Sequence, residues 1–332
     1  METEPIIGFS NYLRPEIIVP TELIQEGWEG KVYSLDVAGD SKQNTPSIVK
    51  VRYAGEVAWE KTRREYEALK IMHAIGFSVP RPFFIGVNST LGISCLAMEQ
   101  LSGLSMLDIL RSGSVSKDQL LRKFCQIYAD MHNIDYEVIP QDSLLRSGDT
   151  SMEADINRLA FQVEKFSLPG FERAIGWLRR NEVEPYKRTI VHGDFHYGNV
   201  IIMQNQSVEK AFVVDWGNFE ISDPRKDLAW SRLLMSTQSF KFYPDDLLTG
   251  YETSLGTRVD NISYFDAYSA CKRLLTIFIS LTRGSDKEGF MKSARKIMEQ
   301  KVNHIRGVYA VFSQLTGLQI KEVDDFITAG KL

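Results

Sequence analysis

The chain reads TIVHGDFHYGNVIIM from Thr189 to Met203 and, after a polar turn, AFVVDWG from Ala211 to Gly217. The short apolar, β-rich runs predict strands that deliver two acidic residues near their tips, Asp194 and Asp215. An asparagine, Asn199, follows the first of them by five positions. Phosphoryl transfer needs such a set, because one carboxylate can take the proton of an attacking hydroxyl while the other oxygens hold Mg²⁺ on the nucleotide phosphates.

A β-hairpin with acidic turn residues is the plain alternative for this stretch. It explains a single aspartate, but it does not explain His192-Gly193-Asp194 and Asn199 at a kinase-like spacing before Asp215-Trp216-Gly217. The stretch resembles the catalytic core of the aminoglycoside phosphotransferase and choline kinase-like family, small-molecule relatives of the protein kinases. The resemblance continues in DPRKDLA, from Asp223 to Ala229. Its specific motifs lie between about residues 190 and 230, and its layout covers most of the chain.

The resemblance implies a role for each of these positions. Asp194 would be the catalytic residue that orients the acceptor hydroxyl and takes its proton. Asn199 and Asp215 would be the ligands of Mg²⁺. His192 is expected to tie the catalytic loop to its neighbours, and Asp227 to brace that loop, although an acid in a first helical turn is also favoured by the helix dipole.

The same resemblance implies the fold class, α+β, with a bilobal protein-kinase-like architecture. The amino-terminal lobe would hold a small antiparallel β-sheet with one long helix, and the larger carboxy-terminal lobe would be mainly helical. A chain of 332 residues has room for two such lobes. We expect a nucleotide-binding lobe over residues 1–98, a hinge over 99–103, and a helical lobe with the catalytic loop and substrate site over 104–332.

Residues 21–53 predict three strands, with Gly27 and Gly30 at the turn between the first two. Two glycines there would let the backbone fold over phosphates, although most glycine pairs between strands are ordinary turns. Lys50 interrupts the apolar third strand, so its side chain either lies on a solvated face or reaches into a nucleotide site. The position of the glycine pair ahead of this lysine favours the second interpretation.

A helix is predicted from Glu56 to Ile75. In the family, an acid on the first long helix pairs with the strand lysine and holds it toward the α- and β-phosphates. The resemblance therefore indicates Glu65 as the partner of Lys50, with Glu67 as a competitor. An ordinary surface i,i+4 pair is the alternative for Glu65.

A polar, glycine-containing crossing near residue 100 leads from the strands into the helical region. In the family the backbone of this crossing binds the adenine edge, which assigns Glu99 and Leu101 to that role and Met98 to the pocket wall. A plain interdomain linker would have the same composition.

The rest of the chain predicts helices, with Ser116 as an N-cap and His132 at the end of the helix that follows it. We expect His132 to cap that helix or pack on the catalytic loop. The predicted helices span residues 116–132, 151–182 in two parts broken at 167–170, 225–235, 244–255, 261–282, 287–312 and 322–329.

Composition excludes several classes of protein. The chain is 43% hydrophobic and 25% charged, with a net charge of −4 and no long basic run, which argues against nucleic acid as a partner. No apolar run reaches the ~20 residues of a membrane span, and no signal peptide is visible. Cys95, Cys125 and Cys271 are widely spaced and predict buried, reduced thiols, hence a cytoplasmic location. Nothing in the pattern indicates an oligomeric state.

The sequence thus predicts a phosphotransferase that moves the γ-phosphate of ATP, or GTP, to a hydroxyl of an aminoglycoside-, sugar- or amino-alcohol-like molecule, with Mg²⁺. A catalytically silent nucleotide-binding scaffold is one alternative, and an atypical protein kinase is another. Only residues 218–224 separate the Asp215 motif from the next predicted helix, which leaves no room for a peptide-docking segment. His196 suggests zinc, but no third ligand shows a suitable spacing.

Overall fold

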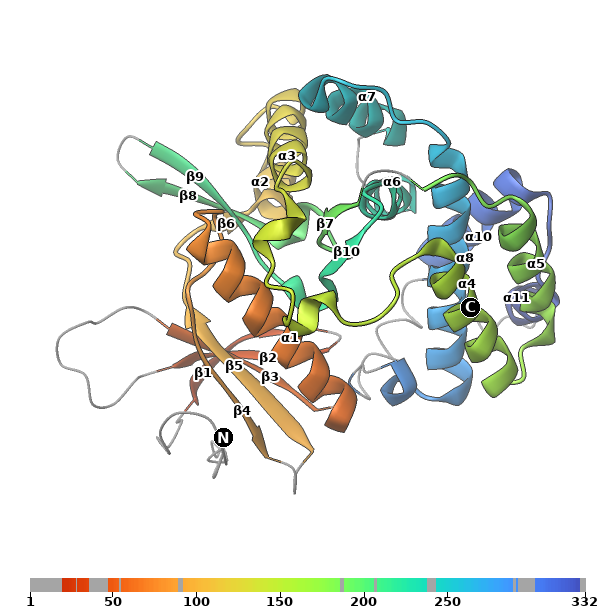
Figure 1. The fold of residues 1–332 in the computed structure, drawn as a ribbon, viewed down its shortest axis with the longest axis horizontal. Helices are drawn as coiled ribbons and strands as arrows, with labels where there is room; N and C mark the ends of the chain where they lie inside the picture. The colour runs from red at the N-terminus through yellow and green to blue at the C-terminus, as the bar shows by residue number, and fades with distance from the viewer. Residues whose placement is uncertain are drawn as a thin grey trace. The chain divides into compact units, whose positions relative to one another are not determined.

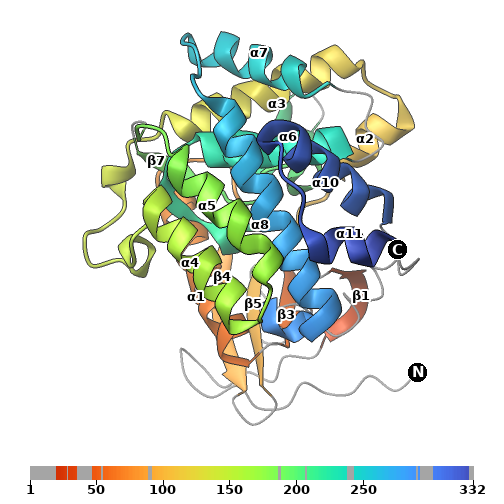
Figure 2. The same ribbon diagram turned by 90° about the vertical axis from the view of Figure 1, so that its right-hand side faces the viewer.

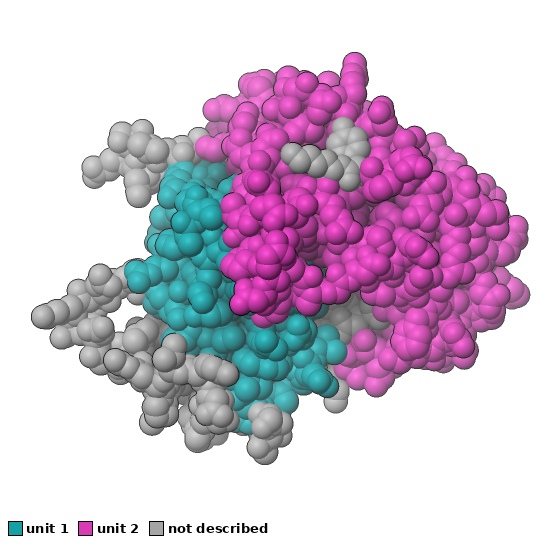
Figure 3. Space-filling model, viewed as in Figure 1, with its two compact units in different colours: residues 1–108, 198–219, 289–294 teal, residues 109–197, 220–288, 295–332 magenta. Residues whose placement is uncertain are grey.

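The computed structural model describes most of the chain. The described residues are 20–27, 29–35, 47–53, 55–88, 92–185, 188–205, 208–237, 243–288, 291 and 302–328. The chain divides into two compact units, coloured separately in Figure 3. Unit 1 comprises residues 1–108, 198–219 and 289–294, and unit 2 comprises residues 109–197, 220–288 and 295–332. The lobe boundaries expected from the sequence stay a prediction.

Unit 1 is built on a five-stranded antiparallel sheet in the order β1-β2-β3-β5-β4 (Figure 1). Its strands are β1 (Pro20–Glu26), β2 (Gly30–Leu35), β3 (Ser47–Arg52), β4 (Pro82–Asn88) and β5 (Ile93–Glu99). Small and β-branched side chains of β3 and β5 form its core, where Val49 lies opposite Ala97 and Val51 opposite Cys95. The three strands predicted over residues 21–53 are confirmed, with residues 36–46 outside the described part.

Helix α1 (Gly55–Ala74) packs against strands β4 and β5 of this sheet. Its buried positions recur every three or four residues and include Ala68, Leu69 and Met72, as expected for an amphipathic helix. The same buried face carries Glu65, which is 1% exposed. A buried carboxylate on an apolar face requires compensating cations, and these come from β3.

A second sheet of unit 1 has the order β6-β8-β9 and contains β6 (Leu104–Ser105), β8 (Val200–Asn205) and β9 (Val208–Val213). After β9 the chain forms a 3-10 turn at Trp216–Asn218, which contacts α1. The fully buried Trp216 donates its indole N–H to the carbonyl of Val213 at 3.0 Å and meets the ring of Phe77 edge-on. The segment that carries Asp215 is therefore fixed to the helix that carries Glu65.

Unit 2 is mainly helical. Its helices are α2 (Met106–Ser112, which begins at the boundary with unit 1), α3 (Lys117–His132), α4 (Met152–Lys165), α5 (Glu172–Arg180), α6 (Arg225–Thr237), α7 (Pro244–Leu255), α8 (Ile262–Arg283), α10 (Val302–Thr316) and α11 (Lys321–Thr328). Helix α8 contacts α4, α5, α6 and α10, and Figure 2 shows it among them. Most of its residues are buried, which is typical of a core helix rather than of a surface one.

Most of the predicted helices are confirmed. Ser116 caps α3 as expected, since its hydroxyl accepts the backbone N–H of Gln119 at 3.3 Å. Of the helix predicted over residues 287–312, only α10 is described, and residues 289–290 and 292–301 lie outside the described part. Among the helices of the described chain, none combines the length and the apolar character that a bilayer crossing requires.

Two short strands, β6 and β10, were not predicted. β10 (Glu220–Ser222) pairs antiparallel with β7 (Thr189–Val191), with Ile221 opposite Ile190. Strands of two or three residues are too short to show an alternating pattern, so the sequence alone predicts plain connections at both places. The pairing of β10 with β7 anchors the strand that precedes the predicted catalytic loop.

Candidate active site

The predicted catalytic loop follows β7 in unit 2, and a single carboxylate holds its backbone. Asp227, in the first turn of α6, accepts the backbone N–H groups of His192 and Gly193, each at 2.7 Å. The side chain of Asp227 is fully buried, so these charge-assisted bonds replace its hydration. Gly193 has φ +79°, a conformation that favours glycine, which explains why this residue stands before the aspartate.

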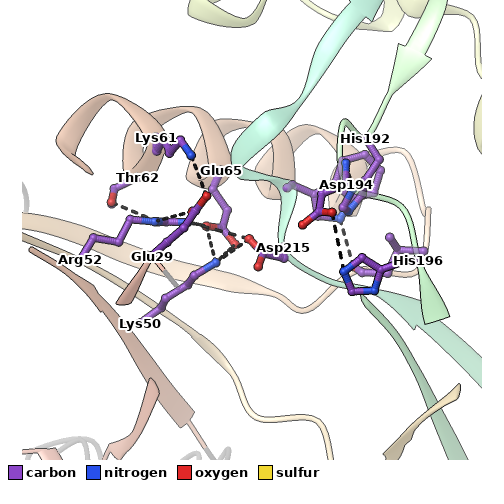
Figure 4. A network of polar contacts seen from close by, with 12 residues as sticks. Glu29, Lys50, Arg52, Lys61, Thr62, Glu65, His192, Asp194, His196 and Asp215 are labelled. Carbon is purple, nitrogen blue, oxygen red and sulfur yellow. Dashed lines mark hydrogen bonds and ion pairs between the residues drawn. The ribbon is translucent and has the colours of Figure 1, made fainter. Parts of the chain in front are cut away.

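Asp194 is held by its own loop and by α6. Its backbone N–H donates to Nδ1 of the buried His192 at 3.2 Å, and its Oδ1 accepts the indole N–H of Trp230 at 2.7 Å. Nε2 of His196 lies 3.6 Å from the same oxygen (Figure 4). Because the Asp194 side chain remains 30% exposed, a ligand can reach a carboxylate whose orientation is already set.

Aromatic packing supports the loop from beneath. Phe195 is fully buried and stacks on Tyr128 of α3 at 4.2 Å between ring centroids. His132, at the end of α3, contacts Asp227, the residue that holds the backbone of the loop. Its Nε2 lies 3.5 Å from Oδ2 of Asp227. Its Nδ1 is 2.7 Å from the hydroxyl of Tyr251. The expected packing role of His132 is therefore confirmed.

In unit 1, Lys50 of β3 meets two carboxylates from distant parts of the chain (Figure 4). Its Nζ lies 3.3 Å from Glu65 of α1 and 2.5 Å from Oδ1 of Asp215. Burial and the neighbouring Arg52 lower the pKa of Lys50, but the three carboxylates of Asp215, Glu65 and Glu29 outweigh them and leave it raised. Lys50 thus carries its charge at neutral pH, and the pairing with Glu65 suggested by the resemblance is present.

Arg52 forms the tightest contacts of this cluster, and the sequence did not predict it. Its guanidinium is 1% exposed and contacts the Glu65 carboxylate, with Nη1 donating to Thr62 at 3.2 Å. Burial acts to lower the pKa of Arg52, but Glu65 and Glu29 raise it overall. Because side chains two apart on a strand share a face, Lys50 and Arg52 reach the same carboxylate.

The turn between β1 and β2 is tied to α1 through Glu29. Its carboxylate lies 2.6 Å from Nζ of Lys61 and 3.6 Å from Nε of Arg52. Burial raises the pKa of Glu29, but these two cations lower it overall. Gly27 donates its N–H to the carbonyl of Gly30 at 2.9 Å, and Trp28 between them lies outside the described residues.

The close approach of β2 to β3 explains why residue 30 is a glycine. A Cβ there would lie 2.1 Å from the carbonyl oxygen of Val51, so only glycine permits this approach of β2 to β3. The phosphate-binding role of Gly27 and Gly30 stays a prediction.

Asn199 and Asp215 stand at the same end of the β8–β9 hairpin in unit 1. The strands pair Val200 with Val213, and just beyond that pair the N–H of Val214 donates to the carbonyl of Asn199 at 3.0 Å. Asp215 follows with φ +69°, a left-handed conformation that is uncommon outside glycine and frequent at functional sites. One carboxylate and one side-chain amide at one hairpin end fit Mg²⁺, a hard cation that prefers oxygen ligands.

The part of the chain that the structure describes holds no cluster of three or more His, Cys, Asp and Glu side chains arranged for a metal ion. Mg²⁺ is commonly bound by one or two protein oxygen ligands together with water and phosphate, which are the ligand types that Asn199 and Asp215 offer.

The hinge residues lie at the end of β5. Glu99 donates its backbone N–H to the carbonyl of Arg81 at 2.9 Å, and its side chain accepts the backbone N–H of Arg81 at 3.1 Å. Met98 is buried at 6% exposure, and Leu101 is half-buried. The adenine-binding role of Met98, Glu99 and Leu101 stays a prediction.

Comparison with known proteins adds the family. The model of the phosphotransferase enzyme family, APH, matches residues 21–260, which is more than half of the chain. The chain belongs to the phosphotransferase enzyme family. The resemblance stated from the sequence is thereby confirmed.

Solved structures share the protein-kinase-like fold of this family member. An aminoglycoside-3'-phosphotransferase of type VIII is 20% identical and has a TM-score of 0.53, covering 73% of this chain and 90% of its own. A GDP and kanamycin complex of APH(2")-IIIa is 16% identical, with a TM-score of 0.57 and coverage of 84% and 92%. A microcompartment-associated aminopropanol kinase is 13% identical, with a TM-score of 0.54 and coverage of 91% and 94%. The predicted fold class is confirmed.

The match to the curated relatives covers about half of this chain and less than a quarter of each relative. Acyl-CoA dehydrogenase family member 10 of Mus musculus is 27% identical over 176 residues, 51% of this chain and 16% of its own length. Acyl-CoA dehydrogenase family member 11 of Homo sapiens is 22% identical over 187 residues, 54% of this chain and 23% of its own. This family member spans less than a quarter of the relatives' length.

Three residues of the site, Arg52, Trp230 and Glu29, were not predicted from the sequence. Arg52 follows Lys50 by two positions, and that spacing on a strand could have assigned both to one face. Trp230 and Glu29 contact Asp194 and Lys61 through tertiary packing between separate segments, which no local pattern reports.

Proposed function

We propose that this chain transfers the γ-phosphoryl group of ATP to a hydroxyl of a small molecule. The observation that carries the proposal is the contact of Lys50 with both Glu65 and Asp215, because it assembles a buried cation and two acids from β3, α1 and the end of β9. Family membership supports the class of reaction. Asp194, held in orientation but exposed, supports the role of a proton acceptor.

Nucleotide binding would start from Lys50. Its ammonium group would bind the α- and β-phosphates while Glu65 holds the side chain extended. Since Asp215 lies 2.5 Å from Nζ, phosphate binding must draw Lys50 away from Asp215 and free that carboxylate for a cation. Arg52 keeps Glu65 charged and in place during this exchange, because its guanidinium contacts the same carboxylate. Met98, Glu99 and Leu101 would receive the adenine.

Bound Mg²⁺, held by Asp215 and the side-chain oxygen of Asn199, would neutralise charge on the phosphates. Asp194 would accept a hydrogen bond from the acceptor hydroxyl and hold its oxygen in line with the γ-phosphorus. A bond forms between that oxygen and phosphorus as the bond to the β-phosphate oxygen breaks. The hydroxyl proton passes to Asp194, and ADP leaves with the electron pair of the broken bond.

The acceptor class follows from the short connection after the Asp215 motif. Between the 3-10 turn at Trp216–Asn218 and α6, the chain holds only the three-residue strand β10, so it offers little surface on which a peptide could dock. The solved structures with this fold include a phosphotransferase in complex with GDP and kanamycin and a protein named as an aminopropanol kinase. We therefore propose a hydroxylated small molecule as acceptor, in the cytoplasm, where the free, buried Cys95, Cys125 and Cys271 would stay reduced.

The test is release of ADP or GDP from ATP or GTP with a library of aminoglycosides, sugars and amino alcohols, with Mg²⁺ and with a chelator. We expect at least one acceptor to raise the rate of ADP or GDP release above the rate without acceptor, and only when Mg²⁺ is present. Nucleotide binding without acceptor-dependent turnover would favour a silent scaffold. Turnover with peptides alone would favour a protein kinase.

A further inference from the structure

Three side chains of unit 2 form a chain of contacts that ends on Asp194, and the mechanism above gives no role to two of them, Arg273 and His304. Trp230 of α6 donates its indole N–H to Oδ1 of Asp194 at 2.7 Å. The guanidinium of Arg273, from α8, lies over the Trp230 ring with Cζ 5.6 Å from the centroid. Nε of Arg273 lies 3.4 Å from Nε2 of His304, on α10. Side chains of α6 and α8 are therefore linked to Asp194, the expected proton acceptor, through the indole of Trp230.

The indole N–H restricts how Asp194 can point. A hydrogen bond to a charged acceptor is worth more than one between neutral groups, so it holds the carboxylate against rotation. The acceptor hydroxyl needs a fixed carboxylate, because a misplaced one loses in-line geometry. Within the same loop, Nε2 of His196 lies 3.6 Å from the same Oδ1, and His192 accepts the backbone N–H of Asp194.

Arg273 adds a positive charge near Asp194. One indole ring separates the guanidinium from the carboxylate, which places the two charges within about one Debye length, roughly 10 Å at 0.1 M salt. Burial lowers the pKa of the Arg273 guanidinium to about 10, and the negative charge of Asp194 offsets only part of this effect. Arg273 is half-buried, and its place over the Trp230 ring, beside His304, keeps its charge next to the indole that bonds Asp194.

We propose that Trp230 and Arg273 are positioning residues for Asp194, with the indole N–H fixing the carboxylate and the guanidinium holding the indole and the negative charge in place. This inference rests on the proposed function of Asp194. It differs from a purely structural role, in which the same contacts would only join α6 to α8. A structural role predicts loss of stability, and a positioning role predicts loss of turnover.

The test uses variants that keep the packing. Trp230→Phe removes the N–H and keeps an aromatic face for Arg273, and Arg273→Met removes the charge and keeps apolar volume. Arg273→Lys restores a charge. Trp177→Phe is the matched control, since Trp177 is a half-buried indole of unit 2 that stacks on Tyr264. Arg283→Gln is the second control, since Arg283 is an exposed arginine of the same helix that donates to the carbonyl of Phe166.

We expect Trp230→Phe to lower kcat roughly 10- to 100-fold, the range for a lost hydrogen bond to a charge, with KM for the nucleotide within about threefold of the parent. Arg273→Met should lower kcat about tenfold without lowering Tm, and Arg273→Lys should recover most of that loss. Both controls should keep the parental kcat. Parental kcat in Trp230→Phe and Arg273→Met, or a fall in Tm without a fall in kcat, would overturn the inference.

A stability cycle separates this inference from the proposed function. Trp230→Phe, Asp194→Ala and the double variant are unfolded in urea, and the bond between the two residues predicts that their effects are not additive. If no acceptor supports turnover while this coupling is present, the proposed function fails and the positioning role falls with it, although the contact stands. If turnover is found and the variants keep it, only the inference fails.

Discussion

The two units hold their functional side chains by different means. In unit 1, Lys50 is held by side-chain ion pairs between segments that are far apart in sequence, with Glu65 at 3.3 Å and Asp215 at 2.5 Å. In unit 2, the catalytic loop is held by its own backbone, whose N–H groups donate to the fixed carboxylate of Asp227 at 2.7 Å.

The difference matters for what each region can do. Ion pairs between flexible side chains can exchange partners when a phosphate or a cation arrives, whereas backbone bonds to a buried acid cannot exchange without opening the loop. This contrast agrees with the proposal that unit 1 receives a charged nucleotide while unit 2 keeps one carboxylate in a constant orientation. The following predictions test this contrast, from the largest effect to the smallest.

Asp194→Asn should remove the proton acceptor and leave the loop intact. We expect turnover to fall by about 10² to 10⁴, the range for a general base, because an amide cannot take the hydroxyl proton. The Kd for nucleotide, measured by calorimetry, should change less than about threefold. A variant with more than half of the parental turnover would show that Asp194 does not act in the reaction.

Arg52→Met should damage the stability of unit 1 more than any other single charge removal there. It leaves the buried Glu65 without its closest cation, a loss of about 3 to 5 kcal/mol for a broken buried pair. Urea unfolding measures the loss, and Arg52→Lys, which keeps one positive charge, should recover part of it. An unchanged free energy of unfolding would mean that Lys50 alone neutralises Glu65.

Lys50→Met should weaken nucleotide binding rather than the fold, because Arg52 still neutralises Glu65. We expect the Kd for ATP to rise roughly 10- to 100-fold, as for a lost bond between charged groups, with a fall in Tm smaller than that of Arg52→Met. Lys70→Met, at an exposed position of α1, is the control. Equal Kd values for the parent and Lys50→Met would remove Lys50 from the nucleotide site.

Asp155→Asn probes a charge cluster of unit 2 that has no expected part in the chemistry. Asp155 lies 2.6 Å from Nζ of the buried Lys226. Burial raises the pKa of Asp155, but Lys226 and Lys272 lower it overall. A carboxyl group whose pKa is lowered in the folded protein stabilises the fold at pH values above its ordinary pKa of 3.8. This contribution is lost as the pH falls through the folded pKa.

The Tm difference between the parent and Asp155→Asn should therefore be largest near neutral pH and shrink below pH 3.8. Turnover of the variant should stay within about threefold of the parent, since stability and chemistry are separate here. Asp142→Asn, at an exposed position, is the control. A Tm difference that grows on acidification would contradict the direction of the shift.

Much of the fold could be predicted from the sequence because local patterns decide it. The alternation in β3, the buried stripe of α1 and the N-cap at Ser116 all depend on residues within one element. The loop residues His192 and Asp194 and the paired hairpin ends at Asn199 and Asp215 were recognisable by spacing. Strand β10 escaped because three residues carry no periodic signal.

The supporting contacts of the site could not be predicted in the same way. Asp194 and Trp230 are separated by 36 residues, and Lys50 and Asp215 by 165. Which side chains meet across such distances depends on how helices and strands pack, and no single-segment pattern records it. Arg52 was missed for another reason: a second basic residue on a strand is usually solvated, and here burial reverses that expectation.

The most direct measurement follows the phosphoryl group itself. The parent and Asp194→Asn are incubated with Mg²⁺, ATP labelled with heavy oxygen in its γ-phosphate and the best acceptor, and the acceptor is analysed by mass spectrometry. We predict that the parent gives an acceptor carrying one labelled phosphoryl group on a hydroxyl oxygen, and that Asp194→Asn gives it at least about a hundredfold more slowly. Label found only in inorganic phosphate, or equal labelling by both proteins, would contradict phosphoryl transfer assisted by Asp194.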